Sequence, residues 1–115
     1  MNTGILARGF ALTVAIAEYA ERKLRSALGH HRRAVHAATM RLGDLNGPRG
    51  GIDKSCIVEV RGPALVPVVV RERDSDLYAA IDRATARLAQ ALTRRVERRR
   101  AIGRALSARG AVAER

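Results

Sequence analysis

Aromatic side chains are nearly absent from this sequence, which contains one Phe, two Tyr and no Trp. A hydrophobic core must therefore be built from Val, Leu, Ile and Ala, and 47% of the 115 residues are apolar, enough for one domain. Proteins that read single-stranded nucleic acid stack bases on aromatic rings, and helices that lie on membranes usually bury Trp, Phe or bulky Leu. With only Phe10, Tyr19 and Tyr78 available, the sequence disfavours both kinds of binding.

Cysteine pairs and long apolar runs are also missing. Cys56 is the only cysteine, so no internal disulfide can form, which suits a reducing cytoplasm. No apolar run reaches the roughly 18 residues that a membrane-spanning helix needs. The apolar stretch after Arg8 soon meets Glu18 and Glu21 and has no small-residue cleavage pattern. We therefore predict no signal peptide and a cytoplasmic location.

Acidic residues are scarce relative to basic ones. The chain has 22 Lys and Arg against 11 Asp and Glu, a net charge of +11. Residues 83–115 hold 10 Arg and 2 Glu, a net of +8, whereas residues 1–82 hold 12 basic and 9 acidic residues, a net of +3. A domain this basic repels itself and favours a polyanionic partner. The asymmetry indicates that the C-terminal part of the chain contacts that partner.

Hydrophobic periodicity predicts four strands and two helices. Thr13 suits the start of the first helix, Gly29 its end, and the Asp74–Asp76 cluster the start of the second helix. Pro67 indicates that the last strand lies at an edge or contains a bulge. In chain order the predicted strand, helix, three strands and helix cover residues 3–8, 13–29, 35–42, 56–61, 65–70 and 77–98.

Connecting segments complete this prediction. A Gly-rich hairpin loop at 43–51 and a turn at 62–63 separate the last three strands. Two helices cannot cover both faces of so small a sheet. We therefore predict an α+β domain of βαβββα order, with both helices packed on one face of a four-stranded, largely antiparallel sheet; the direction of the first strand stays open.

The end of the chain contains two helix-weakening residues, Gly103 and Gly110. We expect the second helix to fray after Arg98 for this reason. The predicted organisation is one folded domain over 1–100 and a basic, disordered tail over 101–115.

The second predicted helix carries the most informative pattern. Four arginines are separated by 4, 7 and 4 residues, so they fall near one side of the helix, away from its apolar stripe. No acid interrupts residues 83–96, and guanidinium groups fork onto phosphate oxygens with two hydrogen bonds. The row and its two flanking residues are Arg83, Arg87, Arg94 and Arg98, with Arg95 and Arg99. The pattern favours binding to the phosphates of structured RNA over a merely solvated helix face.

Catalytic and metal-binding patterns are not recognisable in the sequence. The three histidines, His30, His31 and His36, lack metal-ligand spacing. Cys56 falls on the buried side of its strand. The carboxylates at 76 and 82 have no accompanying nucleophile or base, and the Gly-rich loop lacks the Gly-Lys-Ser/Thr ending of a phosphate loop. We therefore predict no enzymatic activity, metal, cofactor or small-molecule substrate.

A seven-residue run in the second helix is similar to a known family signature. The run Asp-Leu-Tyr-Ala-Ala-Ile-Asp at 76–82, followed by Arg87, Leu88 and a basic helix end, resembles that of the ribosome hibernation-promoting factor and ribosome-associated inhibitor family, once called sigma-54 modulation proteins. The segments 8–13 and 44–54 resemble short members of this family. The resemblance implies the βαβββα fold and binding to the small ribosomal subunit near the decoding centre, which blocks translation in starved or stationary cells.

The resemblance also implies roles for particular side chains. Tyr78 and Ile81 would be packing residues of the motif. Contacts with ribosomal RNA would come from Arg83, Arg87, Arg94, Arg95 and Arg98, supported by Arg22, Lys23 and Arg25 near the end of the first helix. Short members lack the further domain through which long members pair ribosomes, and we expect a monomer when the protein is free. The alternative function is a protein-binding regulator associated with transcription, which would use the same basic helix.

Overall fold

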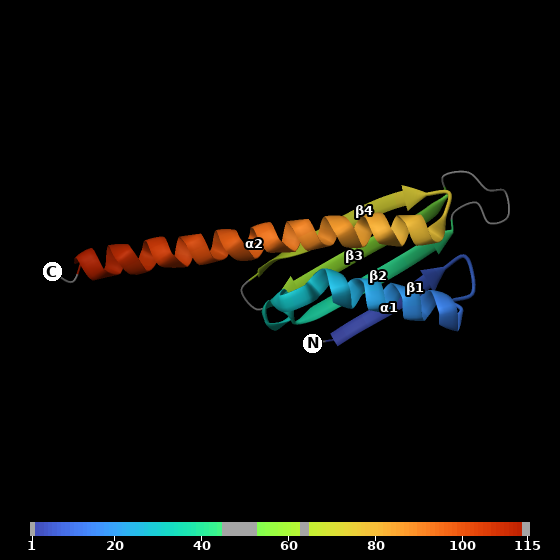
Figure 1. Ribbon diagram of the computed structural model, residues 1–115, viewed down its shortest axis with the longest axis horizontal. Helices are drawn as coiled ribbons and strands as arrows, with labels where there is room; N and C mark the ends of the chain where they lie inside the picture. The colour runs from blue at the N-terminus through green and yellow to red at the C-terminus, as the bar shows by residue number, and fades with distance from the viewer. Residues whose placement is uncertain (1, 45–52, 63–64, 114–115) are drawn as a thin grey trace.

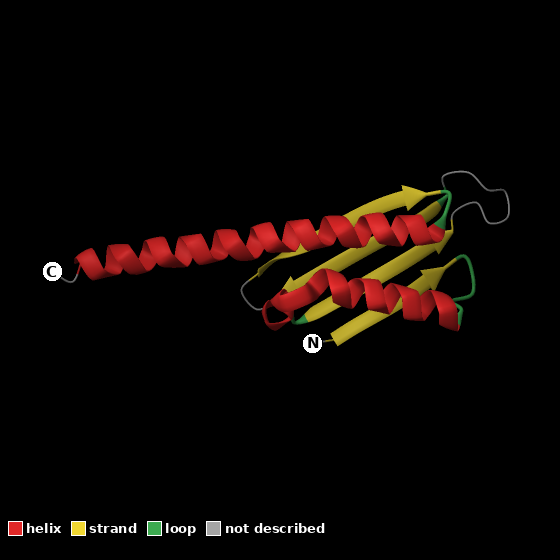
Figure 2. Ribbon diagram, in the orientation of Figure 1, coloured by secondary structure: helices red, strands yellow, loops and turns green. Residues whose placement is uncertain are grey.

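A single sheet with two helices on one of its faces forms the body of the protein (Figure 1). The computed structural model describes residues 2–44, 53–62 and 65–113, with side chains except at 65–66 and 108–113. In chain order the elements are β1 (Asn2–Arg8), α1 (Val14–Leu28), a 3-10 helix (Gly29–Ala34), β2 (Ala37–Asp44), β3 (Lys54–Gly62), β4 (Leu65–Asp74) and α2 (Leu77–Ala113). Figure 2 shows both helices on the same side of the strands. The predicted α+β fold and βαβββα order are confirmed.

The four strands lie in the order β1-β2-β3-β4. β1 runs parallel to β2, from Asn2 opposite Ala37 to Arg8 opposite Gly43, whereas the other two pairs are antiparallel. A parallel pair needs a long crossover connection, and α1 supplies it. This settles the direction of the first strand. β4 lies at an edge of the sheet, and its pairing with β3 shifts register between Val60 and Gly62, where Pro67 falls, so the sheet has both features that Pro67 predicted as alternatives.

Alternate residues of β2, β3 and β4 are buried beneath the helices. Their side chains meet the apolar stripes of α1 and α2, which recur at helical spacing as the sequence predicts. Phe10 and Tyr19 pack only at the margin of the core. The core residues are Ala38, Met40, Leu42, Cys56, Val58, Val60, Val68 and Val70 from the sheet, and Ala20, Leu24, Leu28, Ala80, Ile81, Ala84, Leu88, Leu92 and Val96 from the helices. An aliphatic core is thus confirmed.

The two ends of α1 follow their local sequence. The hydroxyl oxygen of Thr13 accepts a hydrogen bond from the backbone N–H of Ile16 at 3.2 Å, which satisfies one of the free donors of the first turn. Gly29 ends the helix with a φ of 51°, in the left-handed region that favours glycine. Both predicted ends are therefore confirmed.

α2 continues far beyond the sheet (Figure 1). Val96 is its last buried residue, yet the helix proceeds to Ala113 and gives the molecule extents of 69 × 23 × 17 Å. The structure describes α2 as helical past Arg98, where the sequence predicted fraying. The division into a folded domain over 1–100 and a disordered tail over 101–115 stays a prediction. A glycine such as Gly103 costs only about 1 kcal/mol relative to Ala, and the surrounding Ala, Leu and Arg residues favour helix. The helix is continuous across the domain boundary predicted at residue 100.

β4 is also longer than the sequence predicts. It continues past Val70 to Asp74, because Arg71 pairs with Ile57 of β3 and Arg73 pairs with Ser55 of β3. The predicted hairpin loop at 43–51 falls outside the described residues except for its first two positions, which belong to β2, and the predicted turn is described only at residue 62.

Candidate nucleic-acid interface

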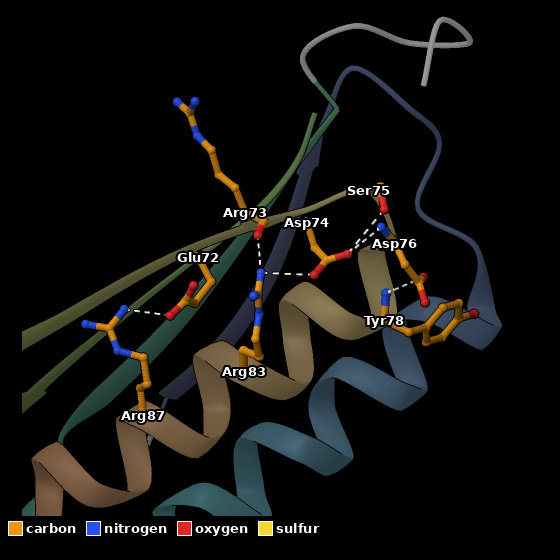
Figure 3. A network of polar contacts seen from close by, with 8 residues as sticks. All are labelled: Glu72, Arg73, Asp74, Ser75, Asp76, Tyr78, Arg83 and Arg87. Atoms are coloured by element: carbon orange, nitrogen blue, oxygen red, sulfur yellow. Dashed lines mark hydrogen bonds and ion pairs between the residues drawn. The ribbon is translucent and has the colours of Figure 1, made fainter. Parts of the chain in front are cut away.

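The start of α2 is held by a cluster of acidic side chains (Figure 3). The Asp74 carboxylate accepts a hydrogen bond from the Asp76 backbone N–H at 3.0 Å, and the Asp76 carboxylate accepts one from the Tyr78 backbone N–H at 3.1 Å. The bond from the Asp76 backbone, together with the nearby Arg83 guanidinium, lowers the pKa of Asp74. These negative charges lie at the positive end of the helix dipole. They determine where α2 begins and so which way each of its arginines points.

The first two arginines of the predicted row turn back onto the edge strand. Arg83 Nη2 lies 3.0 Å from Asp74 Oδ2 and donates to the backbone carbonyl of Arg73. Arg87 Nη1 lies 2.6 Å from Glu72 Oε1 and 3.2 Å from the backbone carbonyl oxygen of Arg71. Figure 3 shows both guanidinium groups reaching from the helix to β4. Arg83 and Arg87 thus fasten α2 to the sheet, although more than half of each side chain remains exposed.

The next arginines of the row are free of such contacts. Arg94 and Arg98 are exposed, and neither has a hydrogen bond or ion pair to any residue that the structure describes. Arg95 is half-buried and does have an interaction partner. The row therefore divides into a pair that contacts the sheet and a pair that is displayed to solvent.

Past the sheet, the free charge extends along the projecting part of α2. Every residue from 97 to 107 is exposed, and Glu97 is the one acid in that span. Exposed arginines without a hydrogen bond or ion pair to a described residue are Arg94, Arg98, Arg99, Arg100 and Arg104. Within the described residues, no helix is both long enough and apolar enough to cross a membrane. The exposed arginines make the projecting helix a cationic rod.

The basic residues predicted on α1 mostly have partners. Lys23 Nζ lies 3.4 Å from Asp82 of α2, and Arg25 lies 2.7 Å from Glu21, one helical turn earlier. The Arg22 guanidinium lies 5.5 Å from the ring centre of a tyrosine, within cation–π range. These residues lie beside the junction of the two helices, and Arg22 and Arg25 remain exposed.

Two tyrosines join the helices at that junction. The rings of Tyr19 and Tyr78 meet edge to face with their centres 4.9 Å apart. The Tyr19 hydroxyl donates to the Asp82 carboxylate, and this bond, with burial, raises the pKa of Tyr19. Ile81 is fully buried beside them. The packing role predicted for Ile81 is therefore confirmed, whereas Tyr78 contacts Tyr19 but stays 39% exposed.

The histidines and the cysteine have structural surroundings. His31 is buried, and its Nε2 lies 3.2 Å from Thr93 Oγ1, so it ties the 3-10 helix to α2. Burial, then the neighbouring His30 and Arg100, lowers the pKa of His31. Cys56 is fully buried, and burial raises the pKa of its thiol to about 12, which makes it unreactive. Within the described residues, no three His, Cys, Asp or Glu side chains are grouped so as to hold a metal.

Two acidic side chains of β4 also bear on the site, although no sequence pattern marked them as partners of the arginines on α2. Glu72 and Asp74 alternate with Arg71 and Arg73 along β4, so the acids face α2 and the arginines face the opposite way. This period of two is visible in the sequence. It was missed because the strand was predicted to end at Val70.

Comparison with known proteins identifies relatives of the whole domain. A profile of the family described as "Sigma 54 modulation protein / S30EA ribosomal protein" matches residues 4–100. The chain is similar to the crystal structure of the Protein Y N-terminal domain from Thermus thermophilus, with 31% identity and a TM-score of 0.65 over 82% of this chain and 98% of that one. It is also similar to a ribosomal subunit interface protein from Coxiella burnetii, with 17% identity and a TM-score of 0.66 over 82% and 96% of the two chains, a likeness that shows the fold alone. Comparison with curated proteins found no match.

Proposed function

Because the chain belongs to the family of sigma 54 modulation proteins and S30EA ribosomal proteins, we propose that it binds the small ribosomal subunit and holds it idle. The contact is with ribosomal RNA near the decoding centre, so that a bound subunit does not translate. The protein acts in the cytoplasm as a binding protein, without a chemical reaction, and is a monomer when free.

The observation that carries this proposal is the set of free guanidinium groups on α2. Arg94 and Arg98 are exposed and unpaired within the described residues, and the arginines at 99, 100 and 104 continue this charge past the sheet. A rigid helix holds these groups apart without further ordering cost, and each can fork onto a phosphate with two hydrogen bonds. Structured RNA offers phosphates at fixed positions, and binding releases its condensed counterions.

The other predicted contact residues have a secondary part in the proposal. Arg83 and Arg87 contact β4 through some of their N–H groups, and their exposed portions leave other donors for RNA. Arg22, Lys23 and Arg25 add positive charge beside the same helix, and Arg95 lies within the basic row. We assign the main share of the affinity to the five free arginines of α2, because none of them has an ion pair with a described carboxylate.

Sedimentation with purified small ribosomal subunits tests this proposal. We expect the chain to co-sediment at low salt and to dissociate as salt rises, with a log–log slope of about −4 if five arginines each contribute roughly 0.7 to 0.9. The Arg94→Gln/Arg98→Gln double variant should lower the magnitude of the slope by about 1.5. Arg61→Gln is the control for loss of an arginine charge, because Arg61 is already paired with Glu59. Absence of co-sedimentation at low salt would contradict the proposal.

Nuclease treatment separates this function from binding to an acidic protein. Complexes held by RNA should be lost when the RNA is digested, whereas a transcription-associated protein partner should be retained. Retention of a partner after complete digestion, with loss on the Arg94→Gln/Arg98→Gln change, would instead support the protein-binding alternative.

A further inference from the structure

The face of the sheet that the helices leave uncovered carries a second group of free arginines. Side chains that alternate with the buried core residues point to this face. Arg8, Arg41, Arg71 and Arg73 are all exposed there, and their side chains have no hydrogen bond or ion pair to any described residue. We call these four residues the sheet-face arginines. Figure 3 shows the Arg73 side chain directed away from α2.

Strand register brings the sheet-face arginines together in two neighbouring rows. Pairing across the sheet aligns Arg8 with Gly43, Gly43 with Ser55, and Ser55 with Arg73. Strands lie about 4.8 Å apart, so roughly 14 Å separates the two arginines at the ends of this row. The next row contains Leu6, Arg41, Ile57 and Arg71. The sheet-face arginines thus come from three of the four strands.

This surface is hollowed near its centre. Gly43 has no side chain, and a Cβ at this position would lie 2.5 Å from the Ser55 hydroxyl oxygen. A depression of about 610 Å³ is lined by residues of β1, β2 and β3, including Arg8 and Arg41. The surface therefore has a hollow whose lining combines Gly43 and Ser55 with larger apolar residues and the guanidinium-bearing Arg8 and Arg41.

Carboxylates are almost absent from the described part of this face. It holds Arg61 and the sheet-face arginines against Glu59, which is five positive charges against one, a net of +4. Glu59 pairs with Arg61, which leaves the others unpaired. The two acids near the end of β4, Glu72 and Asp74, point to the side of the sheet that the helices cover, and they pair there with arginines of α2. The ion pairs that hold α2 thus leave the opposite face without counter-charge.

From these observations the geometry points to a second RNA-binding surface on the uncovered sheet face, so that one chain contacts two RNA segments at once. This inference rests on the proposed function, since it takes RNA as the polyanion. A second copy of the chain would set arginines against arginines and is disfavoured by repulsion. Exposed Leu6 and Val69 offer some apolar contact, but no Trp, Phe or Tyr accompanies them on this face for burial in a membrane surface.

The Arg41→Gln/Arg71→Gln/Arg73→Gln triple variant tests the inference on purified small subunits. These positions are exposed, so the variant should fold, and thermal unfolding checks this. If the sheet face binds RNA, the magnitude of the log–log salt slope falls by about 2 to 3, in addition to the loss caused by Arg94→Gln/Arg98→Gln. The single variants Arg41→Gln and Arg71→Gln, each expected to lower it by roughly 0.8, give the same test if the triple variant does not fold. Arg61→Gln again is the matched control on the same face.

Failure of this inference differs from failure of the proposed function. If the wild-type chain does not bind small subunits at all, the proposed function fails. If the wild type binds but the sheet-face variants keep its affinity and salt slope, only the second surface is overturned. Vesicles containing phosphatidylserine test whether the sheet face binds membranes instead. If the wild type binds these vesicles, and the triple variant loses that binding but still binds small subunits as before, the inference is also overturned.

Discussion

Replacement of Arg87 by Gln separates the structural arginines of α2 from those that are free to bind. The change removes the 2.6 Å ion pair with Glu72 and the 3.2 Å hydrogen bond to the backbone carbonyl of Arg71. Gln keeps most of the aliphatic stem, so lost packing is small. The backbone carbonyl belongs to an edge strand and returns to water, which limits its cost.

The expected loss of stability follows from the exposure of the two partners. The Arg87 side chain is 59% exposed and Glu72 only 19%, so the pair lies between a surface and a buried ion pair. Exposed pairs contribute roughly 0.2–1 kcal/mol, and a hydrogen bond contributes about 0.5–1.5 kcal/mol. With screening of the exposed guanidinium taken into account, we expect a loss of about 1 kcal/mol. For a domain of this size that lowers Tm by about 4 °C.

Thermal or urea unfolding measures this effect, with Arg94→Gln as the matched control. Arg94 lies on the same helix, and its removal subtracts the same charge, but it has no partner among the described residues. The control should change the free energy of unfolding by no more than about 0.5 kcal/mol. A double-mutant cycle with Glu72→Gln should give a coupling energy of roughly 0.5 kcal/mol that shrinks at high salt. Equal losses for Arg87→Gln and Arg94→Gln would refute the division of the arginine row.

Three further predictions concern buried or constrained positions. The Cys56 thiol, whose pKa burial raises to about 12, should resist iodoacetamide at pH 8 in the folded protein and react when urea unfolds the chain; rapid alkylation without unfolding would show that the core is open. The pKa of His31 is lowered from its ordinary 6.5 by burial, so the stability it contributes should be complete above about pH 6.5 and lost as the pH falls through the lowered pKa. His31→Gln should flatten that part of the stability–pH curve measured by urea unfolding, and an unchanged curve would contradict this. Gly9→Ala should cost about 1–3 kcal/mol, because φ is +89° and a Cβ would lie 2.5 Å from a backbone oxygen of β2; Gly4→Ala, with open space around it, is the control, and equal urea midpoints would argue against the strain.

Local sequence signals predicted the secondary structure well where short-range physics decides it. Thr13 and Gly29 bound α1 because a hydroxyl can accept from a nearby N–H and glycine tolerates a positive φ. The alternation around Cys56 and the four-residue spacing around Leu88 identified buried faces before any tertiary contact was known. The end of α2 was mistaken because two glycines were given more weight than the strong helix formers around them.

The charge of the candidate site was predictable only as a total. Composition shows the excess of Arg near the C-terminus, and helical spacing shows that Arg83, Arg87, Arg94 and Arg98 share a side. Neither shows that the first two meet the carboxylates of β4. These pairs join residues nine and fifteen positions apart in the chain, and they depend on how the helix lies against the sheet edge.

By itself, then, the sequence determined which residues are apolar at strand or helix spacing, and hence the order of elements and the predominance of positive charge. The tertiary structure alone decided that β1 is parallel to β2, that the acids of β4 pair with arginines of α2, and that Arg8, Arg41, Arg71 and Arg73 gather on the open face. The physical reason is range. Periodicity and capping act over a few neighbouring residues, whereas strand order, register and ion pairing depend on segments that meet only when the chain has folded.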